Sequence, residues 1–460
     1  MLDAFLRRHG AHPDQIRGEE ALSALLRKME EGLEGRGNIP MIPAYLPAQI
    51  PMPRNSSCCV LDAGGTNLRI AEAVFGPEGG CSIGAFRKLP MPGSQGPITG
   101  ADFFGGLAAD VLALGRPQRV GFCFSYNVDI EASLDGRLIA WCKEIDAPEV
   151  VGRFVGSALK EALGYDCRVH VLNDSVAAML GAAEPVKVGI ILGTGVNVCY
   201  GESCSRIPKL PRAYKGSMIV STEVGEFRGI TPSSFEADLI AATDDPTLAQ
   251  AEKQCSGGYL GENICRCWDA AAREGLLPEG FRDADWSLAQ ISAFLAGEPA
   301  PIPENETARV LAEALICRAA KIAAILCAGP ILRCSGPGET VPTAVEGSQY
   351  WRLTGFRDAF HRELEALIPD RAVKIVKTEE SCLRGAALAA FAEPMEVRGW
   401  TGSMPMSTMP CPWSRKSSWS CWSGPAPAGR PWCWCPIRGS SPAPRRPCWR
   451  NPSIRTGCGC

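Results

Sequence analysis

The chain has 460 residues, and at roughly 150 residues per domain this length predicts two or three domains or one large bilobal unit. Hydrophobic residues make up 46% of the chain, which is enough to bury a sizeable core. The formal net charge is only −3, so electrostatics give no reason to expect a nucleic acid or an anionic membrane as partner. The sequence lacks an apolar run of about 18 residues and an N-terminal secretory pattern. We therefore expect a cytoplasmic protein.

The 22 cysteines are interpreted as free thiols. Seven of them follow residue 396, and most of the others stand in apolar stretches, where a thiol behaves as a small hydrophobic group. Without a secretory signal a disulfide framework is not expected. The chain has four histidines and no Cys-x-x-Cys before residue 397, so a zinc site is not expected either.

The composition changes beyond Glu396. Nine of the 47 Lys and Arg residues and none of the 50 Asp and Glu residues fall within 397–460, so this tail carries +9 and the rest of the chain −12. The tail also has no Leu, so no amphipathic element is predicted there. We interpret residues 397–460 as disordered or as the product of a shifted reading frame, with a Cys- and Trp-rich binding segment left open as an alternative.

The predicted elements begin with an amphipathic helix over residues 19–34, where Leu and Met recur at helical spacing. The Pro-rich stretch 39–53 is not expected to form a regular element. Residues 58–75 predict a β-hairpin around two glycines. A further apolar run ends at Phe124, and residues 150–163 predict a helix.

The second half of the chain continues the alternation of strands and helices. Residues 168–183 predict a strand, a polar break and a helix capped near Asn173–Ser175. Residues 186–202 predict a strand, a Gly-Thr-Gly turn and a second strand. Helices dominate from 231 to 389. This alternation indicates an α/β fold.

Two segments resemble one another, LDAGGTN at 61–67 and ILGTGVN at 191–197. Glycine lets a backbone approach phosphate oxygens closely and present N–H groups to them. One such turn alone is more often an ordinary hairpin. Two in one chain favour a duplicated α/β core with two phosphate-binding hairpins that face one cleft. The motifs of P-loop proteins, Rossmann folds and protein kinases do not occur.

Nine segments, in order and covering about residues 19–395, resemble the hexokinase family of the actin, Hsp70 and sugar-kinase superfamily. LDAGGTNLRI and LGTGVNVCY resemble its two phosphate motifs, and VLNDSVAAML the segment with its catalytic aspartate. FSYNVDI, LIAWCKEI, STEVGEF and GGYLGENI resemble its sugar-contacting segments. VEGSQYWRLTGF and LRGAALAAFA resemble its adenosine region. The Cys-rich zinc motif of bacterial ROK-type glucokinases is absent, which favours the hexokinase branch.

The resemblance implies a sugar site. Asp174, which alone would be interpreted as a helix N-cap, becomes the general base for the sugar 6-hydroxyl, and Lys143 becomes the cation near the transferred phosphoryl group. Polar groups that match a ring of hydroxyls discriminate well, because a buried polar partner left unpaired is costly. The implied sugar-binding residues are Ser125, Cys142, Lys143, Asn173, Asp174, Asn197, Glu223 and Glu262.

The resemblance also implies ATP and Mg²⁺ as cofactors. Asp62 would orient Mg²⁺ through water. For Arg69 a phosphate contact and a structural salt bridge both remain open. The implied nucleotide-binding residues are Asp62, Gly64, Gly65, Thr66, Asn67, Arg69, Gly193, Thr194, Gly195, Gly347 and Ser348.

Three positions depart from the family pattern. Cys142 stands where the family has a threonine that bonds the sugar, and a thiol is a weak donor. Asn127 replaces a proline. Residues 381–383 read Ser-Cys-Leu where Gly-Ser-Gly is common, so nucleotide contacts there are expected to differ.

The alternation of strands and helices predicts an α/β fold, and the resemblance implies that it is a two-lobed actin-like (ribonuclease H-like) ATPase fold with a central cleft. We expect a small lobe at 56–172 with a returning helix at 384–396, a large lobe at 173–383, and residues 1–55 packed on the large lobe. The expected function is phosphorylation of the 6-hydroxyl of a hexose, glucose foremost, as a first step of glycolysis. A hexokinase-like sugar sensor with little turnover is the alternative, and monomer or homodimer stays open.

Overall fold

The computed structural model describes residues 1–64, 67–84, 87–141 and 145–397. The predictions for Gly65, Thr66, Cys142 and Lys143, and those for the tail from residue 398 onwards, lie outside the described residues. Within these ranges, no helix is both long and apolar enough to cross a membrane. The fourteen cysteines that the structure describes in these ranges are free thiols, as predicted.

One sheet is formed by strands from residues 56–172. Its strands are β2 (Ser56–Gly64), β3 (Asn67–Phe75), β4 (Cys81–Ile83), β5 (Arg87–Pro90), β6 (Arg119–Phe124) and β9 (Arg168–Leu172). The order is β4–β3–β2–β6–β9, and β5 pairs with β3. β2, β6 and β9 are parallel, and β3 runs antiparallel to β2, as the predicted hairpin requires. The carboxyl ends of the three parallel strands therefore meet at one edge.

A second sheet gathers strands from both ends of the chain. Its strands are β1 (Ile42–Pro43), β10 (Val188–Leu192), β11 (Val196–Ser203), β12 (Ser217–Ser221), β13 (Thr340–Glu346) and β14 (Ala372–Val376). The order is β1–β12–β11–β10–β13–β14, with β10, β13 and β14 parallel. A separate hairpin pairs β7 (Asn127–Ile130) with β8 (Gly136–Ala140).

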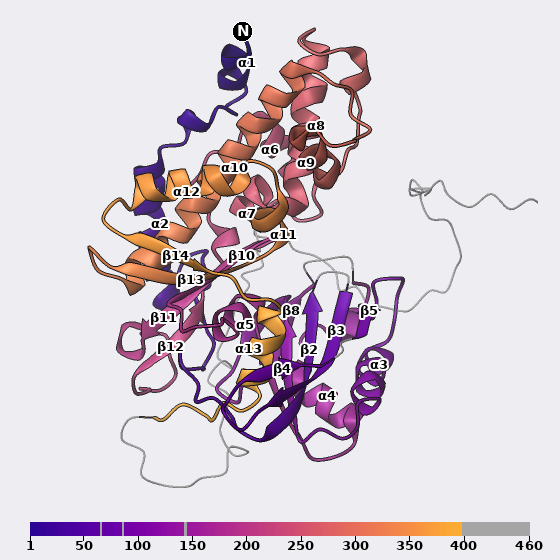
Figure 1. The fold of residues 1–460 in the computed structure, drawn as a ribbon, viewed down its shortest axis with the longest axis vertical. Helices are drawn as coiled ribbons and strands as arrows, with labels where there is room; N and C mark the ends of the chain where they lie inside the picture. Colours follow the sequence, from indigo (N-terminus) through magenta and orange to yellow (C-terminus); the bar gives the residue numbers. More distant parts are fainter. Residues whose placement is uncertain (65–66, 85–86, 142–144, 398–460) are drawn as a thin grey trace, which may run out of the picture. The chain divides into compact units, whose positions relative to one another are not determined.

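The α-helices pack on these sheets and on one another (Figure 1). They are α1 (Leu2–Arg8), α2 (Gly18–Leu33), α3 (Gly100–Leu112), α4 (Val155–Leu163), α5 (Asp174–Leu180), α6 (Ser234–Ala242), α7 (Gln250–Cys255), α8 (Gly257–Arg273), α9 (Leu288–Ala296), α10 (Glu306–Cys334), α11 (Ser348–Arg352), α12 (Phe356–Leu367) and α13 (Ser381–Ala389). Five 3₁₀ turns accompany them, at Pro13–Gln15, Pro148–Val150, Cys204–Arg206, Val224–Glu226 and Glu279–Phe281. α10 packs against α2, α8 and α12. α6, α8 and α9 lie together around α10, away from the first sheet (Figure 1).

Helices α5 and α13 pack closely against each other through glycines. A Cβ at Gly181 would overlap the carbonyl oxygen of Ser381, and one at Gly385 would overlap that of Ala177. α5 also contacts β10 and β11, whereas α13 contacts β2 and β6. This pair of helices thus joins the two sheets. α13 begins and ends earlier than the predicted helix at 384–396.

The N-terminal segment adds to the second sheet. Leu25 and Met29 of α2 lie against Gly329 of α10. The Pro-rich stretch, for which no regular element was predicted, forms β1, with Ile42 opposite Ser221. Proline is tolerated there because β1 is an edge strand, where one side of the backbone needs no ladder partner.

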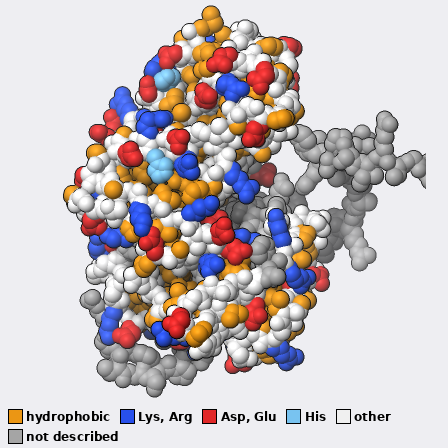
Figure 2. Space-filling view, viewed as in Figure 1, with side chains coloured by type: hydrophobic (Ala, Val, Ile, Leu, Met, Phe, Trp, Pro, Cys, Tyr) orange, Lys and Arg blue, Asp and Glu red, His pale blue; other side chains and the backbone are white. Residues whose placement is uncertain are grey.

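Helix α4 begins later than predicted. The helix predicted at 150–163 is α4, which begins only at Val155, after the 3₁₀ turn at Pro148–Val150. The lobe boundaries themselves stay a prediction. On the face drawn in Figure 2, acidic and basic side chains are interspersed.

Candidate active site

Predicted site residues gather at the carboxyl ends of the parallel strands in the first sheet. Asp62 lies opposite Cys123 of β6, which in turn lies opposite Leu172 of β9. Ser125 follows β6, and its backbone N–H donates to the carbonyl of Ala63 at 3.1 Å. Asn173 and Asp174 follow β9 directly. Ligands in open α/β sheets bind at such carboxyl ends, so this edge is the candidate site.

Asn173 and Asp174 form the start of α5. Asn173 is the N-cap, because its Oδ1 accepts hydrogen bonds from the backbone N–H and the hydroxyl of Ser175 at 2.8 and 2.7 Å. Asp174 is the first helical residue, so the cap predicted near Asn173–Ser175 is Asn173. Capping uses Oδ1 of Asn173 and leaves its Nδ2 as a donor.

Asn197, Ser221 and Glu223 form a hydrogen-bond network at the ends of β11 and β12. Asn197 Nδ2 donates to Glu223 Oε1 at 2.6 Å and to Ser221 Oγ at 3.1 Å. The backbone N–H of Glu223 donates to Asn197 Oδ1 at 3.0 Å. Glu223 holds a left-handed backbone with φ of 58°, rare for a residue with a side chain and found at functional sites.

The same network sets the charge state of Glu223. The pKa of its carboxyl is raised to about 7, chiefly by burial and also by the carboxylates of Asp174 and Glu252, whereas hydrogen bonds from Ser221 and Asn197 oppose the rise. This carboxyl therefore titrates near neutral pH. In that range it can accept or donate a hydrogen bond to a hydroxyl.

The predicted second phosphate turn, Gly193–Gly195, lies at the carboxyl end of β10. The backbone N–H groups of Gly257 and Gly258 donate to the carbonyls of Gly193 and Thr194 at 2.8 and 3.0 Å. A Cβ at Gly195 would stand 2.7 Å from Oε2 of Glu252. These contacts hold the turn, and a side chain at Gly195 would displace the Glu252 carboxylate.

Gly347 brings the predicted adenosine segment to the same turn. β10 and β13 are parallel, with Ile191 opposite Glu346, so Gly347 and Ser348 follow β13 beside Gly193. Gly347 has φ of 121°, and a Cβ there would overlap the carbonyl oxygen of Leu192. Only glycine fits this close approach. The residues present thus form the kind of glycine cradle that a nucleotide phosphate requires.

Asp62 is buried and forms an ion pair with Arg69 across the β2–β3 hairpin, with Nε to Oδ2 at 2.8 Å. In the described ranges no group of three or more His, Cys, Asp or Glu side chains could hold a metal ion. Mg²⁺ is commonly bound through one or two carboxylates together with substrate phosphates. A single carboxylate beside a phosphate cradle fits an ion that arrives with the nucleotide. Of the two interpretations of Arg69, this structure contains the salt bridge.

Among the described residues, the hydrogen bonds of the Glu262 side chain go to Arg266 and not to the Asn197–Glu223 network. Glu262 lies on α8, two positions from the buried residues Leu260 and Ile264, and so on the opposite face of the helix. Its side chain is 53% exposed and pairs with Arg266. Its role in sugar binding stays a prediction.

Glu252 of α7 is a residue that sequence reasoning missed. Its Oε2 accepts a hydrogen bond from the backbone N–H of Val196 at 2.9 Å, next to Asn197. The helical spacing of α8, with Glu262 off the apolar stripe, was the signal that could have separated the two glutamates. Ser175 and Ser221 were also missed, although both stand in motif segments, because the resemblance implies no role for either position.

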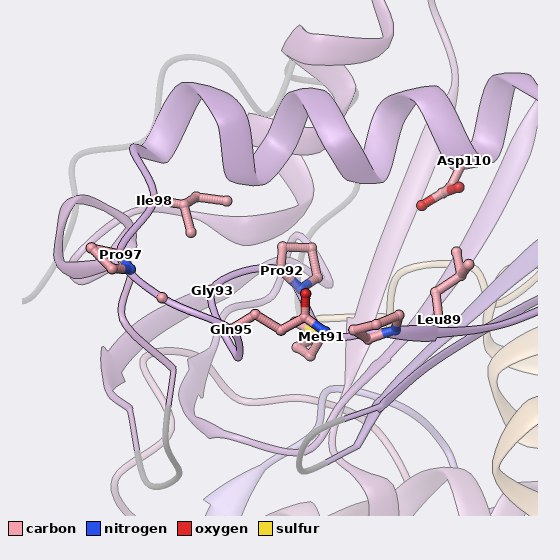
Figure 3. A pocket seen from close by; sticks show the side chains of 10 residues that line it. Leu89, Met91, Pro92, Gly93, Gln95, Pro97, Ile98 and Asp110 are labelled. Carbon is pink, nitrogen blue, oxygen red and sulfur yellow. The ribbon is translucent and has the colours of Figure 1, made fainter. Parts of the chain in front are cut away.

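A small cavity of about 10 Å³ lies at the network. Asn173, Ser221 and Glu223 line it together with Ile42, Ala44, Tyr126, Val128, Ile130 and Val176. A larger hollow of about 490 Å³ lies along the loop between β5 and α3, lined by Leu89, Met91, Ile98 and Asp110 among others (Figure 3). None of the predicted site residues lines this larger hollow, so the chemistry assigns the candidate site to the network.

The fold and the site together define a class. Two α/β units joined through α5 and α13, with the glycine turn at Gly193–Gly195 at the edge of the second sheet, form the actin-like ATPase fold. A solved hexokinase from Schistosoma mansoni, complexed with glucose, superposes with a TM-score of 0.73 at 23% identity, over 85% of this chain and 98% of that chain.

Sequence comparisons identify the family. Two family models described as hexokinase match residues 2–183 and 187–392. The hexokinase-like 1 protein of Arabidopsis thaliana is 33% identical over 275 residues, 53% of this chain and 55% of its own length, so the match spans little more than half of that relative. Hexokinase-7 of Oryza sativa is 28% identical over 85% of this chain and 96% of its own length. The chain belongs to the hexokinase family.

Proposed function

We propose that this protein transfers the γ-phosphoryl group of ATP to the 6-hydroxyl of a hexose such as glucose. The observation that carries the proposal is the contact of Asn173, the neighbour of Asp174, with the Asn197–Glu223 pair, beside the glycine turn at Gly193–Gly195. Hydroxyl-binding groups and a phosphate cradle then meet at one place, which is what transfer between a sugar and a nucleotide needs.

Asp174 is proposed as the general base. Its carboxylate would accept the proton of the 6-hydroxyl as the oxygen bonds to the γ-phosphorus and the bond to the ADP oxygen breaks. No covalent enzyme intermediate is needed, because positioning and charge stabilisation supply most of the catalysis of phosphoryl transfer. Lys143 is proposed as the cation near the transferred group.

The remaining hydroxyls of the sugar are proposed to bind the polar network. Nδ2 of Asn173 is a donor and the Glu223 carboxylate an acceptor, a combination that matches a hydroxyl group. Glu252, whose Oε2 bonds to Val196, is added to this set. Ser125 follows β6 at the same edge.

The nucleotide is proposed to lie along the two glycine turns, with Gly347 and Ser348 towards the adenosine. Mg²⁺, held chiefly by phosphate oxygens and oriented by Asp62, would neutralise the charge of the phosphates. Arg69 pairs with Asp62 and so orients this carboxylate.

A coupled assay of ADP formation with the full chain, ATP–Mg²⁺ and a panel of hexoses tests the proposal. We expect turnover with glucose and none when the sugar is omitted. If none of the hexoses is turned over but glucose binds in calorimetry, the result would favour the sugar-sensor alternative that Cys142 and residues 381–383 suggest. Absence of both turnover and binding would contradict either function.

A further inference from the structure

The network around Glu223 contains a serine, the first residue of the STEVGEF segment, to which neither the resemblance nor the proposed reaction gives a role. Ser221 ends β12, is 2% exposed, and lies opposite Cys199 of β11 on one side and Ile42 of β1 on the other. Its hydroxyl approaches four partners. They are Asn197 Nδ2 at 3.1 Å, Glu223 Oε1 at 2.9 Å, Ser175 Oγ at 3.4 Å and Asn173 Oδ1 at 3.5 Å.

The orientation of the Asn197 amide decides which way the bonds run. Its Oδ1 accepts from the backbone N–H groups of Val198 at 2.8 Å and Glu223 at 3.0 Å. The amide nitrogen must therefore face Ser221 and Glu223, because a flipped amide would set two donors against two N–H groups. Ser221 Oγ thus accepts a hydrogen bond from Asn197.

The single proton of Ser221 then has one favourable acceptor. Asn173 Oδ1 already accepts two short bonds from Ser175 and lies at the longer distance of 3.5 Å. Glu223 Oε1 lies at 2.9 Å and belongs to a carboxyl group, whose charged form makes the stronger hydrogen bond. The proton is therefore donated to Glu223.

The result is an ordered pattern of donors and acceptors. Both side-chain hydrogen bonds that the described residues make to Glu223 end on Oε1. Those to the Asn173 side chain end on Oδ1. Oε2 of Glu223 and Nδ2 of Asn173 are left as an acceptor and a donor for the cavity that these residues line.

We propose that Ser221 is a positioning residue of the hexose site: by giving its only proton to Oε1 of Glu223, it fixes that carboxyl group so that Oε2 serves the ligand. This inference rests on the proposed function for the identity of the ligand. It makes Ser221, which itself need not touch the reacting atoms, a determinant of hexose affinity and of its pH dependence.

The charged and hydrogen-bonding groups around Glu223 set its pKa, and a pH experiment measures the change in that pKa. Among the described residues, the carboxylates that act on it are Asp174 from α5 and Glu252 from α7, and both raise its pKa, whereas Ser221 and Asn197 lower it. Removing the Ser221 hydroxyl therefore raises the pKa of Glu223 further. Ser175 bonds to Asn173 instead, so removing its hydroxyl leaves this pKa in place.

The test compares Ser221→Ala with Ser175→Ala, two buried hydroxyls 3.4 Å apart that serve different partners. Glucose binding to the full chain is measured by calorimetry between about pH 5 and pH 9. For Ser221→Ala we expect a Kd about tenfold higher near neutral pH and a pH midpoint displaced upwards. For Ser175→Ala we expect weaker binding with the wild-type midpoint. Ser221→Cys, similar in size but a weak donor, should behave like the alanine variant.

A second measurement needs no sugar. The melting temperature of the ligand-free proteins is followed over the same pH range. When the pKa of a carboxyl is higher in the folded than in the unfolded protein, the free energy of unfolding falls as the pH rises from the unfolded pKa to the folded pKa. In Ser221→Ala this fall should therefore extend to higher pH than in Ser175→Ala. Identical pH midpoints for the two variants, or a wild-type profile for Ser221→Cys, would overturn the proposal. Failure of the wild type to bind any hexose would contradict the proposed function and leave the melting profiles to decide the role of Ser221.

Discussion

Arg69 holds the carboxylate of Asp62 across the β2–β3 hairpin, where the two residues lie directly opposite each other in the antiparallel register. Asp62 is 6% exposed at its side chain, whereas Arg69 is 31% exposed. The aspartate is therefore the buried partner and depends on the arginine for compensation of its charge. A ligand that brings a cation to Asp62 has to share it with Arg69.

Asp62→Asn should weaken the binding of ATP–Mg²⁺ while leaving glucose binding near the wild-type value, because the sugar network is built from other elements. It should also lower the stability of the protein by on the order of 1–3 kcal/mol, since Arg69 loses its partner. Calorimetry with each ligand and thermal melting measure the two effects. Lower stability with unchanged nucleotide affinity would make the pair purely structural.

Asp174→Asn should reduce phosphoryl transfer by about 10²–10⁴-fold, because an amide cannot take a proton. Its Oδ1 can still accept the bond from the N–H of Ser175, so α5 and glucose binding should persist. Asp166→Asn is the matched control, since Asp166 forms only a surface pair with Lys160. Turnover near the wild-type rate would place the base elsewhere.

Glu252→Gln and Glu262→Gln form a matched pair on neighbouring helices. Glu252→Gln should raise the Kd for glucose about tenfold or more, because hydrogen bonds to a charged group contribute roughly 1.5–3 kcal/mol. Glu262→Gln removes only an exposed pair with Arg266 and should change the Kd little. Glucose titration of both variants reads the result, and the reverse order of effects would support the prediction for Glu262 instead.

Glu223→Gln should melt at a higher temperature than the wild type at about pH 8 and lose this advantage at about pH 4, below the unfolded pKa. The reason is that the folded pKa of about 7 exceeds the unfolded value, so the ionised carboxylate costs stability that rises with pH through this window. The amide keeps an acceptor for Asn197 and Ser221. Glucose binding should nevertheless weaken. Melting curves that differ equally at both pH values would exclude titration of Glu223 as the cause.

Gly347→Ala and Gly338→Ala both introduce a side chain at a positive φ, of 121° and 79°. At Gly338 no atom lies within 4 Å of the new Cβ, so only the backbone penalty of about 1–2 kcal/mol is expected. At Gly347 the Cβ overlaps the carbonyl of Leu192, so a larger loss of stability and of nucleotide affinity is expected. Chemical denaturation and ADP titration measure both. Equal effects would mean that the turn at Gly193 can move aside.

Much of the fold could be predicted because its signals are local. The β2–β3 hairpin follows from two apolar runs around glycines, and the cap at Asn173 from a polar residue between a strand and a helix. The glycine turn after β10 was visible in the same way. Each of these features depends on a few consecutive residues, whose backbone preferences act within one turn or one strand.

Other features depend on residues far apart in the chain. The prolines of the stretch at 39–53 argued against a strand. β1 nevertheless forms, because Ile42 pairs with Ser221 at the edge of the second sheet. α13 packs its Gly385 against Ala177 of α5, a residue far away in the chain. No pattern within either segment carries this information.

The sequence by itself determined the alternation of strands and helices, the two glycine turns and the order of motifs that marks the hexokinase family, because these are written in short runs of residue types. Only the tertiary structure decided that Glu252 accepts a hydrogen bond from the backbone N–H of Val196, and that the Ser221 hydroxyl donates to Glu223. The physical reason is that a hydrogen-bond partner is set by strand register and by the face a helix presents. Both depend on the packing of the whole core rather than on neighbours in the chain.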